Sequence, residues 1–87
     1  MEKIIKVIAL TSNQILISEI EEVGSADIGE PDCKLIKPFL VTEGKMLEPF
    51  LTGYTREDIF MMGSDKILTL CDPTPTLLEK YQDLVKD

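Results

Sequence analysis

Short apolar segments separated by turn-forming residues make up most of this 87-residue chain, and this pattern limits the folds open to it. The first segment, residues 4–10, is rich in isoleucine and valine, whose branched side chains favour extended backbone. The turn signal of residues 11–14 follows, and its Asn13 tolerates a left-handed conformation. Apolar runs of this length are far too short to span a membrane. The pattern therefore predicts a single domain built mainly of short β-strands.

Residues 15–23 are the most ambiguous segment, because a helix pattern and a strand pattern overlap in them. Apolar residues recur at helical spacing, and Thr11 with Gln14 could form a capping box in front of them. The segment also contains three isoleucines, which are stiff at their first side-chain torsion and favour a strand. We interpret it as a strand in a hairpin with residues 4–10, followed by a glycine-containing loop over residues 24–31.

Two similar segments, residues 35–40 and 46–51, each place a proline before phenylalanine and leucine. A hairpin that is symmetric about residues 43–44 would place Pro38 opposite Pro49. Neither proline can donate a hydrogen bond to a neighbouring strand, so both should lie at a bend, a bulge or an edge. The repeat is too short for a solenoid and predicts one bent hairpin.

Two further strands are predicted nearer the end of the chain, over residues 58–62 and 66–71. Residues 63–65, with the sequence Gly-Ser-Asp, form a tight turn between them. Met61 and Met62 must then point to opposite faces of their strand, so that one of the pair packs in the core.

The last segment predicts an amphipathic helix after the extended, proline-containing residues 72–75. Thr76 and Glu79 have the spacing of a capping box. Five apolar or aromatic residues then form one stripe at helical spacing: Leu77, Leu78, Tyr81, Leu84 and Val85. We therefore expect a single domain over the whole chain, with β-structure in residues 1–72 and a helical region in residues 73–87.

The residues needed for a familiar enzyme mechanism are missing from this chain. It contains no histidine, which removes the Ser-His and Cys-His pairs and the usual metal ligands. Cys33 and Cys71 are too few for a disulfide framework and are expected to be reduced and buried. No secretory signal is recognised at the N-terminus. We expect a cytoplasmic protein that is not an enzyme, with no cofactor, no metal and no membrane association.

The balance of charge is acidic, with sixteen acidic residues against nine basic ones and a net charge of −7. Affinity for duplex nucleic acid comes mainly from neutralised phosphates, so this balance counts against nonspecific duplex binding. A local group of lysines could still create a positive site. Tyr54 and Arg56 share one loop on which a base could stack, although a hydrated loop with a half-buried tyrosine is favoured.

The order of the predicted elements is similar to that of the Sm-like fold. Residues 7–14 followed by residues 15–20 resemble the first motif of that family, in which an apolar strand and a turn precede a second strand. Asn13 stands at the position of the family's turn glycine, and Ser18 stands at the small residue between two apolar ones. The resemblance implies a small, strongly bent, five-stranded barrel, here with an amphipathic helix at its C-terminus.

Residues 59–65 and then 67–70 resemble the second Sm-like motif, in which an apolar strand ends in a basic residue and glycine. Met62 replaces the basic residue before Gly63, and the acidic loop of the family's uridine pocket has no clear counterpart in residues 24–32. The overall look is closest to the divergent, uncharacterised Sm-like proteins of marine cyanophage type. Members of the family join edge strands into rings, so the resemblance implies a homo-oligomeric ring.

The leading functional expectation is a ring that binds single-stranded RNA or DNA in a non-catalytic role. The alternative is an acidic protein–protein scaffold that binds no nucleic acid. The second Sm-like motif implies contact residues in the tight turn, and charge alone adds two lysines. The candidate nucleic-acid-binding residues are Met62, Gly63, Ser64, Asp65, Lys66, Lys34 and Lys37.

Overall fold

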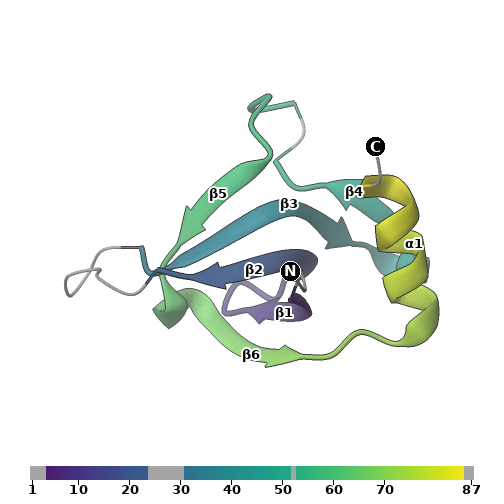
Figure 1. Cartoon of the computed structure of the whole chain (residues 1–87), viewed down its shortest axis with the longest axis horizontal. Helices are drawn as coiled ribbons and strands as arrows, with labels where there is room; N and C mark the ends of the chain where they lie inside the picture. The colour runs from purple at the N-terminus through teal and green to yellow at the C-terminus, as the bar shows by residue number, and fades with distance from the viewer. Residues whose placement is uncertain (1–3, 24–30, 52, 86–87) are drawn as a thin grey trace.

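The computed structural model describes residues 4–51 and 53–85, apart from residues 24–30, and contains a β-sheet with one α-helix against it (Figure 1). The predicted all-β fold with a C-terminal helix is therefore confirmed, and the ambiguous residues 15–22 are extended. The predicted loop over residues 24–31 lies almost wholly outside the described residues. The strands are β1 (Ile5–Leu10), β2 (Ile15–Glu22), β3 (Cys33–Val41), β4 (Leu47–Pro49), β5 (Ile59–Met62) and β6 (Ile67–Cys71), and the helix is α1 (Pro75–Val85).

The sheet is antiparallel in the order β4-β3-β2-β1-β6, and β5 also pairs with β3. Six strands form, one for each strand segment predicted along the chain, whereas the Sm-like resemblance implied five. Strands β4 and β5 pair with different halves of β3. Residues 39–41 pair with β4, whereas residues 33–36 pair with β5. Among the described strands β5 and β6 do not pair with each other, so the sheet stays open between them. They lie on opposite sides of the sheet in Figure 1.

A β-bulge bends β3 in its middle. Ile17 pairs with Phe39 and Glu19 pairs with Ile36, so Lys37 and Pro38 together lie opposite Ser18. Lys37 has a φ of 52°, a left-handed conformation that costs a non-glycine residue about 1–3 kcal/mol. The expectation that this proline marks a bend or bulge is confirmed, and the bulge lets β3 follow two partner strands.

The hairpin between β3 and β4 differs from its predicted register by one residue. Phe39, rather than Pro38, lies opposite Pro49. The turn is a 3₁₀ segment, η1 (Glu43–Lys45), centred on Gly44, which has a φ of 80°. The predicted hairpin was symmetric about residues 43 and 44, whereas the observed one is symmetric about Gly44 alone. The residue opposite Pro49 therefore moves by one position. Glycine takes up this positive φ without the steric cost that a side chain would bring.

The core lies on one face of the sheet, where side chains of β1, β2 and β3 meet. Met62 packs against this core whereas Met61 is 49% exposed, which confirms the predicted division of the pair. Cys33 is buried as predicted, but the prediction for Cys71 is wrong. It is exposed, because β6 has a partner on one side only among the strands that the structure describes. The buried cluster consists of Ile8, Leu10, Leu16, Ile20, Cys33 and Leu35.

The N-cap of helix α1 lies two residues before the predicted capping residue. Thr74, rather than Thr76, caps it, since the Thr74 hydroxyl accepts a hydrogen bond of 3.3 Å from the Leu77 backbone N–H. Pro75 suits the first helical position, where its missing N–H has no partner to lose. The helix packs through Tyr81, which is 1% exposed. Thus the predicted apolar stripe does face the sheet at its centre.

The Tyr81 hydroxyl joins α1 to the bulge. It lies 2.9 Å from the Lys37 carbonyl and 3.1 Å from the Ile36 carbonyl, and it accepts a hydrogen bond of 3.1 Å from the Glu19 N–H. The Tyr81 ring also meets the Phe39 ring edge to face, with 5.8 Å between their centroids. The helix thereby bonds to the backbone of both β2 and β3 at the bulge.

Candidate functional site

The tight turn that was predicted to contact nucleic acid is tied to the rest of the sheet by hydrogen bonds. It forms a 3₁₀ segment, η2 (Ser64–Lys66). The Asp32 carboxylate accepts two hydrogen bonds of 2.6 Å from Ser64, one from the backbone N–H and one from the hydroxyl. These bonds lower the pKa of Asp32, the one from the side chain most. The donors of Ser64 therefore point to Asp32 instead of a ligand.

Removing the Asp32 carboxylate should loosen this turn. We expect Asp32→Ala to lower the midpoint of urea unfolding at pH 7, because both Ser64 donors lose their acceptor. Since the pKa is lowered on folding, the stabilisation is present above the unfolded pKa and is lost as the pH falls through the folded value. The difference between wild type and variant should therefore shrink below about pH 4. Asp65→Ala in the same turn is the matched control, and an equal effect of both changes would contradict this role for Asp32.

Gly63 has an ordinary φ of −75°, so its backbone conformation does not require glycine. A Cβ at this position would lie 2.5 Å from Oδ1 of Asp65. The group nearest to this position is therefore the Asp65 carboxylate, which belongs to the same turn. Asp65 also lies 3.8 Å from the ammonium group of Lys66. Lys66 is the candidate cation of the turn, and its charge lies beside an acidic one.

The other two candidate lysines also lie beside negative or partly negative groups. Lys34 extends from β3 toward Glu21 on β2, with 3.9 Å between Nζ and Oε2. Lys37, at the bulge, donates a hydrogen bond of 3.4 Å from Nζ to the carbonyl of Val85. A cation is favoured there, since the C-terminal end of a helix carries partial negative charge. The three lysines thus do not present isolated positive charges to a phosphate backbone.

The two free edges of the sheet expose apolar side chains. On β5, Ile59 is 47% exposed and Met61 is 49% exposed; on β6, Leu68 is 71% exposed and Leu70 is 44% exposed. Each of these strands has a partner on one side only within the described part of the chain. An edge strand with apolar side chains is a template for pairing with another chain. The sequence predicted edge pairing but could not say which strands would be edges.

A cleft of about 260 Å³ opens where β3 bends away between β4 and β5. All three phenylalanines of the chain line it, and Phe50 and Phe60 meet edge to face with 5.9 Å between their ring centroids. Sequence reasoning missed this cleft, because its walls come from distant segments. The repeated Pro-Phe-Leu pattern was its one visible signal. The lining residues are Lys37, Pro38, Phe39, Pro49, Phe50, Glu57, Asp58, Phe60, Leu84 and Val85.

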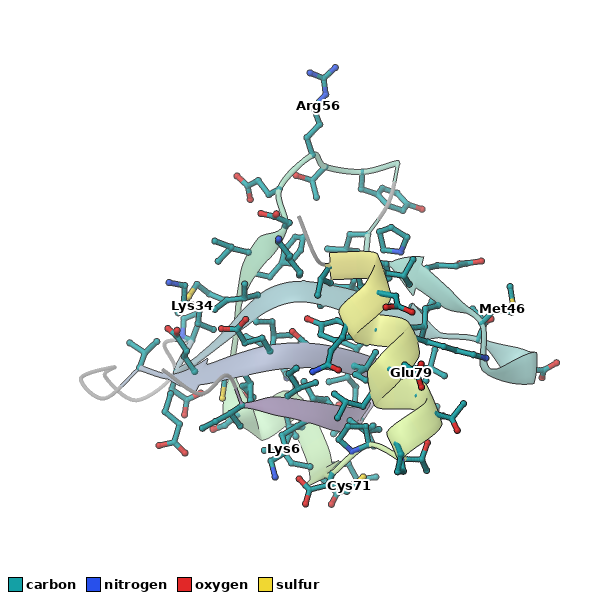
Figure 2. All side chains as sticks on the ribbon, turned by 45° about the vertical axis from the view of Figure 1, so that its right-hand side comes forward. Lys6, Lys34, Met46, Arg56, Cys71 and Glu79 are labelled. Atoms are coloured by element: carbon teal, nitrogen blue, oxygen red, sulfur yellow. The ribbon has the colours of Figure 1, made fainter. Side chains whose placement is uncertain are left out.

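The loop between β4 and β5 carries the remaining candidates, Tyr54 and Arg56. Tyr54 is 87% exposed, so the favoured expectation of a half-buried tyrosine is wrong. Arg56 lies at the tip of the loop and points away from the sheet (Figure 2). Leu51 and Gly53 both have positive φ and turn the chain just before these two residues.

Two classes of site find no support in the described ranges of the chain. No group of three histidine, cysteine or carboxylate side chains there is arranged to hold a metal ion. None of the helical residues described forms a stretch long and apolar enough to cross a membrane.

Comparison with known families gives one match that spans almost the whole chain. A family model described as "Family of unknown function (DUF6561)" matches residues 3–86. A comparison with curated proteins gives no match.

Proposed function

This chain belongs to the DUF6561 family of unknown function, and we propose that it is a self-assembling, non-catalytic protein whose copies join through strands β5 and β6. One observation carries the proposal: the open sheet ends in two edges that expose Ile59 and Met61 on one side and Leu68 and Leu70 on the other. Pairing β5 of one copy with β6 of the next would cover the free sides of both strands.

An interface between two different edges is heterologous, so copies add head to tail. Such an arrangement closes into a ring if the rotation between copies permits it, and a ring leaves neither β5 nor β6 unpaired. The resemblance to Sm-like proteins, whose subunits join edge strands into rings, supports closure. A chain of 87 residues also gains from added burial, because small domains bury a smaller share of their surface.

Assembly is better supported by these observations than nucleic-acid binding. Lys34 and Lys66 lie beside carboxylates, Ser64 is engaged by Asp32, and the chain carries a net charge of −7. We therefore place an acidic protein–protein scaffold ahead of a ring that binds single-stranded RNA or DNA. A cytoplasmic location accords with this proposal, since an exposed free thiol such as Cys71 persists most readily in a reducing compartment.

Light scattering at micromolar protein concentration tests the assembly directly. We expect a single multimeric species, and a monomer at this concentration would overturn the proposal. Small-angle scattering of the same sample should give the profile of a closed ring rather than that of a filament.

Fluorescence polarisation with short labelled oligonucleotides separates the two candidate functions. We expect no salt-sensitive binding at micromolar protein at either of two salt concentrations, because phosphate contacts require accessible positive charge. Binding that falls with salt and weakens in Lys66→Glu would instead assign nucleic acid to the η2 turn. Lys80→Glu, which changes an exposed lysine of α1 by the same charge, is the matched control.

A further inference from the structure

The cleft between β4, β5 and the end of α1 has an aromatic interior. Phe39 comes from β3, Phe50 follows β4 and Phe60 lies on β5, and each of the three is half-buried. Pro38 and Pro49 add apolar surface on either side. The face of an aromatic ring carries negative electrostatic potential, which attracts a cation placed over it. The interior therefore suits an apolar stem that ends in a positive charge.

Two carboxylates stand at the mouth of this cleft. Glu57 and Asp58 are both exposed and immediately precede β5. Their backbone is fixed in place, since the Asp58 carbonyl accepts a hydrogen bond of 2.6 Å from the Lys37 N–H, and the Glu57 N–H donates one of 3.1 Å to the Thr55 hydroxyl. The backbone that carries the two carboxylates is thus bonded to β3 at the bulge.

The last turn of α1 forms the facing wall through Leu84 and Val85. Carbonyl groups at a helix C-terminus carry partial negative charge and favour cations. The ammonium group of Lys37 already binds the Val85 carbonyl, at 3.4 Å, and it is a positive charge that also lines the cleft. Among the lining residues that the structure describes, one ammonium faces two carboxylates and a helix end, so this lining is negative.

We propose that this cleft binds an arginine or lysine side chain from a basic segment of a partner protein. The methylene stem would lie against the phenylalanine rings, and the charged end would meet Glu57 and Asp58. Arginine is the better fit, because its planar guanidinium can both stack on an aromatic ring and bind a carboxylate with two hydrogen bonds. The same charges would repel phosphate, so nucleic acid does not suit this cleft.

This recognition goes beyond self-assembly, since the cleft lies within one copy of the chain. It also gives the acidic scaffold a stated kind of partner. The net charge of −7 would draw a basic segment toward the surface, and the cleft would then select one side chain of it.

A peptide titration followed by NMR tests the proposal on the whole protein. The probe is a short, terminally blocked peptide with a central arginine, and the reference peptide carries citrulline, which has nearly the same shape without the charge. We expect chemical-shift changes at Phe50, Glu57 and Phe60, with the arginine peptide bound at least about tenfold more tightly. Equal shifts with both peptides, or shifts confined to other residues, would overturn the proposal. A short oligonucleotide should produce no shifts in these residues, and shifts there would overturn it as well.

A pair of charge variants separates recognition from overall charge. Glu57→Gln with Asp58→Asn should reduce arginine binding to the level of citrulline, and the fold should persist because both side chains are exposed. Glu43→Gln with Glu48→Gln neutralises two exposed carboxylates of the β3–β4 hairpin and should leave binding unchanged. An equal loss in both pairs would show that net charge alone attracts the peptide. Light scattering on the same samples reports assembly independently, so that failure of the ring cannot be mistaken for failure of the cleft.

Discussion

Replacing Tyr81 with alanine should destabilise the fold by about 3–5 kcal/mol, the usual range for removing a buried aromatic side chain. Tyr81 is 1% exposed and is the buried residue through which α1 contacts the sheet. A small domain is stable by only about 5–15 kcal/mol, so this loss would remove much of the total. Urea unfolding followed by circular dichroism measures the change.

Tyr81→Phe separates the hydroxyl from the ring. We expect it to cost about 1–3 kcal/mol, because the Glu19 N–H and the Lys37 carbonyl each lose a hydrogen bond to the tyrosine hydroxyl, whereas the Ile36 carbonyl keeps that from the Ser18 hydroxyl. Tyr54→Phe makes the same change at an exposed tyrosine and should leave stability unaltered within error. If the two variants unfold at the same urea concentration, the hydroxyl does not secure the bulge.

Local features of the fold could be predicted from the sequence because they depend on neighbouring residues. Asn13, predicted to tolerate a left-handed turn, has a φ of 71° between β1 and β2. The division of Met61 and Met62 between faces follows from the alternation of side chains along a strand. The strand at residues 15–22 was favoured over a helix because of its isoleucines, and it pairs on both sides.

Features that depend on the three-dimensional path of the chain could not be predicted. The bulge at Lys37 is bonded to Tyr81, which lies more than forty residues later in the chain. No local sequence pattern predicts a contact over that separation. The helix began at Pro75 because Thr74 could cap it, although Thr76 had the more familiar capping-box spacing. In each case two local solutions were available, and packing decided between them.

The binding residues were harder to predict than the fold, because their surroundings also depend on the path of the chain. Charge selected Lys34, and motif position selected Lys66. The acidic partner of Lys34, Glu21, becomes visible only once β2 and β3 are paired, whereas Asp65 is the sequence neighbour of Lys66. For the aromatic cleft, the sequence showed the residues but not that they lie together. Its phenylalanines were evident in the sequence, but their convergence depended on β4 and β5 sharing β3 as a partner.

A carboxylate placed on either free edge should break the assembly. In Met61→Glu the change lies on β5, and in Leu68→Glu it lies on β6; both side chains are exposed in a single copy, so the fold should tolerate them. In an assembled interface each new charge would be buried without a partner, which costs several kcal/mol. We expect each variant to weaken association by at least about a hundredfold and to be monomeric at micromolar concentration by light scattering. Met46→Glu, 64% exposed on the β3–β4 hairpin and far from Cys71 of β6 in Figure 2, should assemble like wild type.

Mixing the two edge variants tests the head-to-tail geometry itself. A copy with Met61→Glu keeps an intact β6, and a copy with Leu68→Glu keeps an intact β5. If β5 of one copy pairs with β6 of the next, an equimolar mixture should form dimers and nothing larger, because the remaining edge of each dimer partner is blocked. An interface in which like edges pair would behave differently, since each variant alone would then dimerise through its unaltered edge. Dimers in the separate samples, or monomers in the mixture, would exclude the β5–β6 interface.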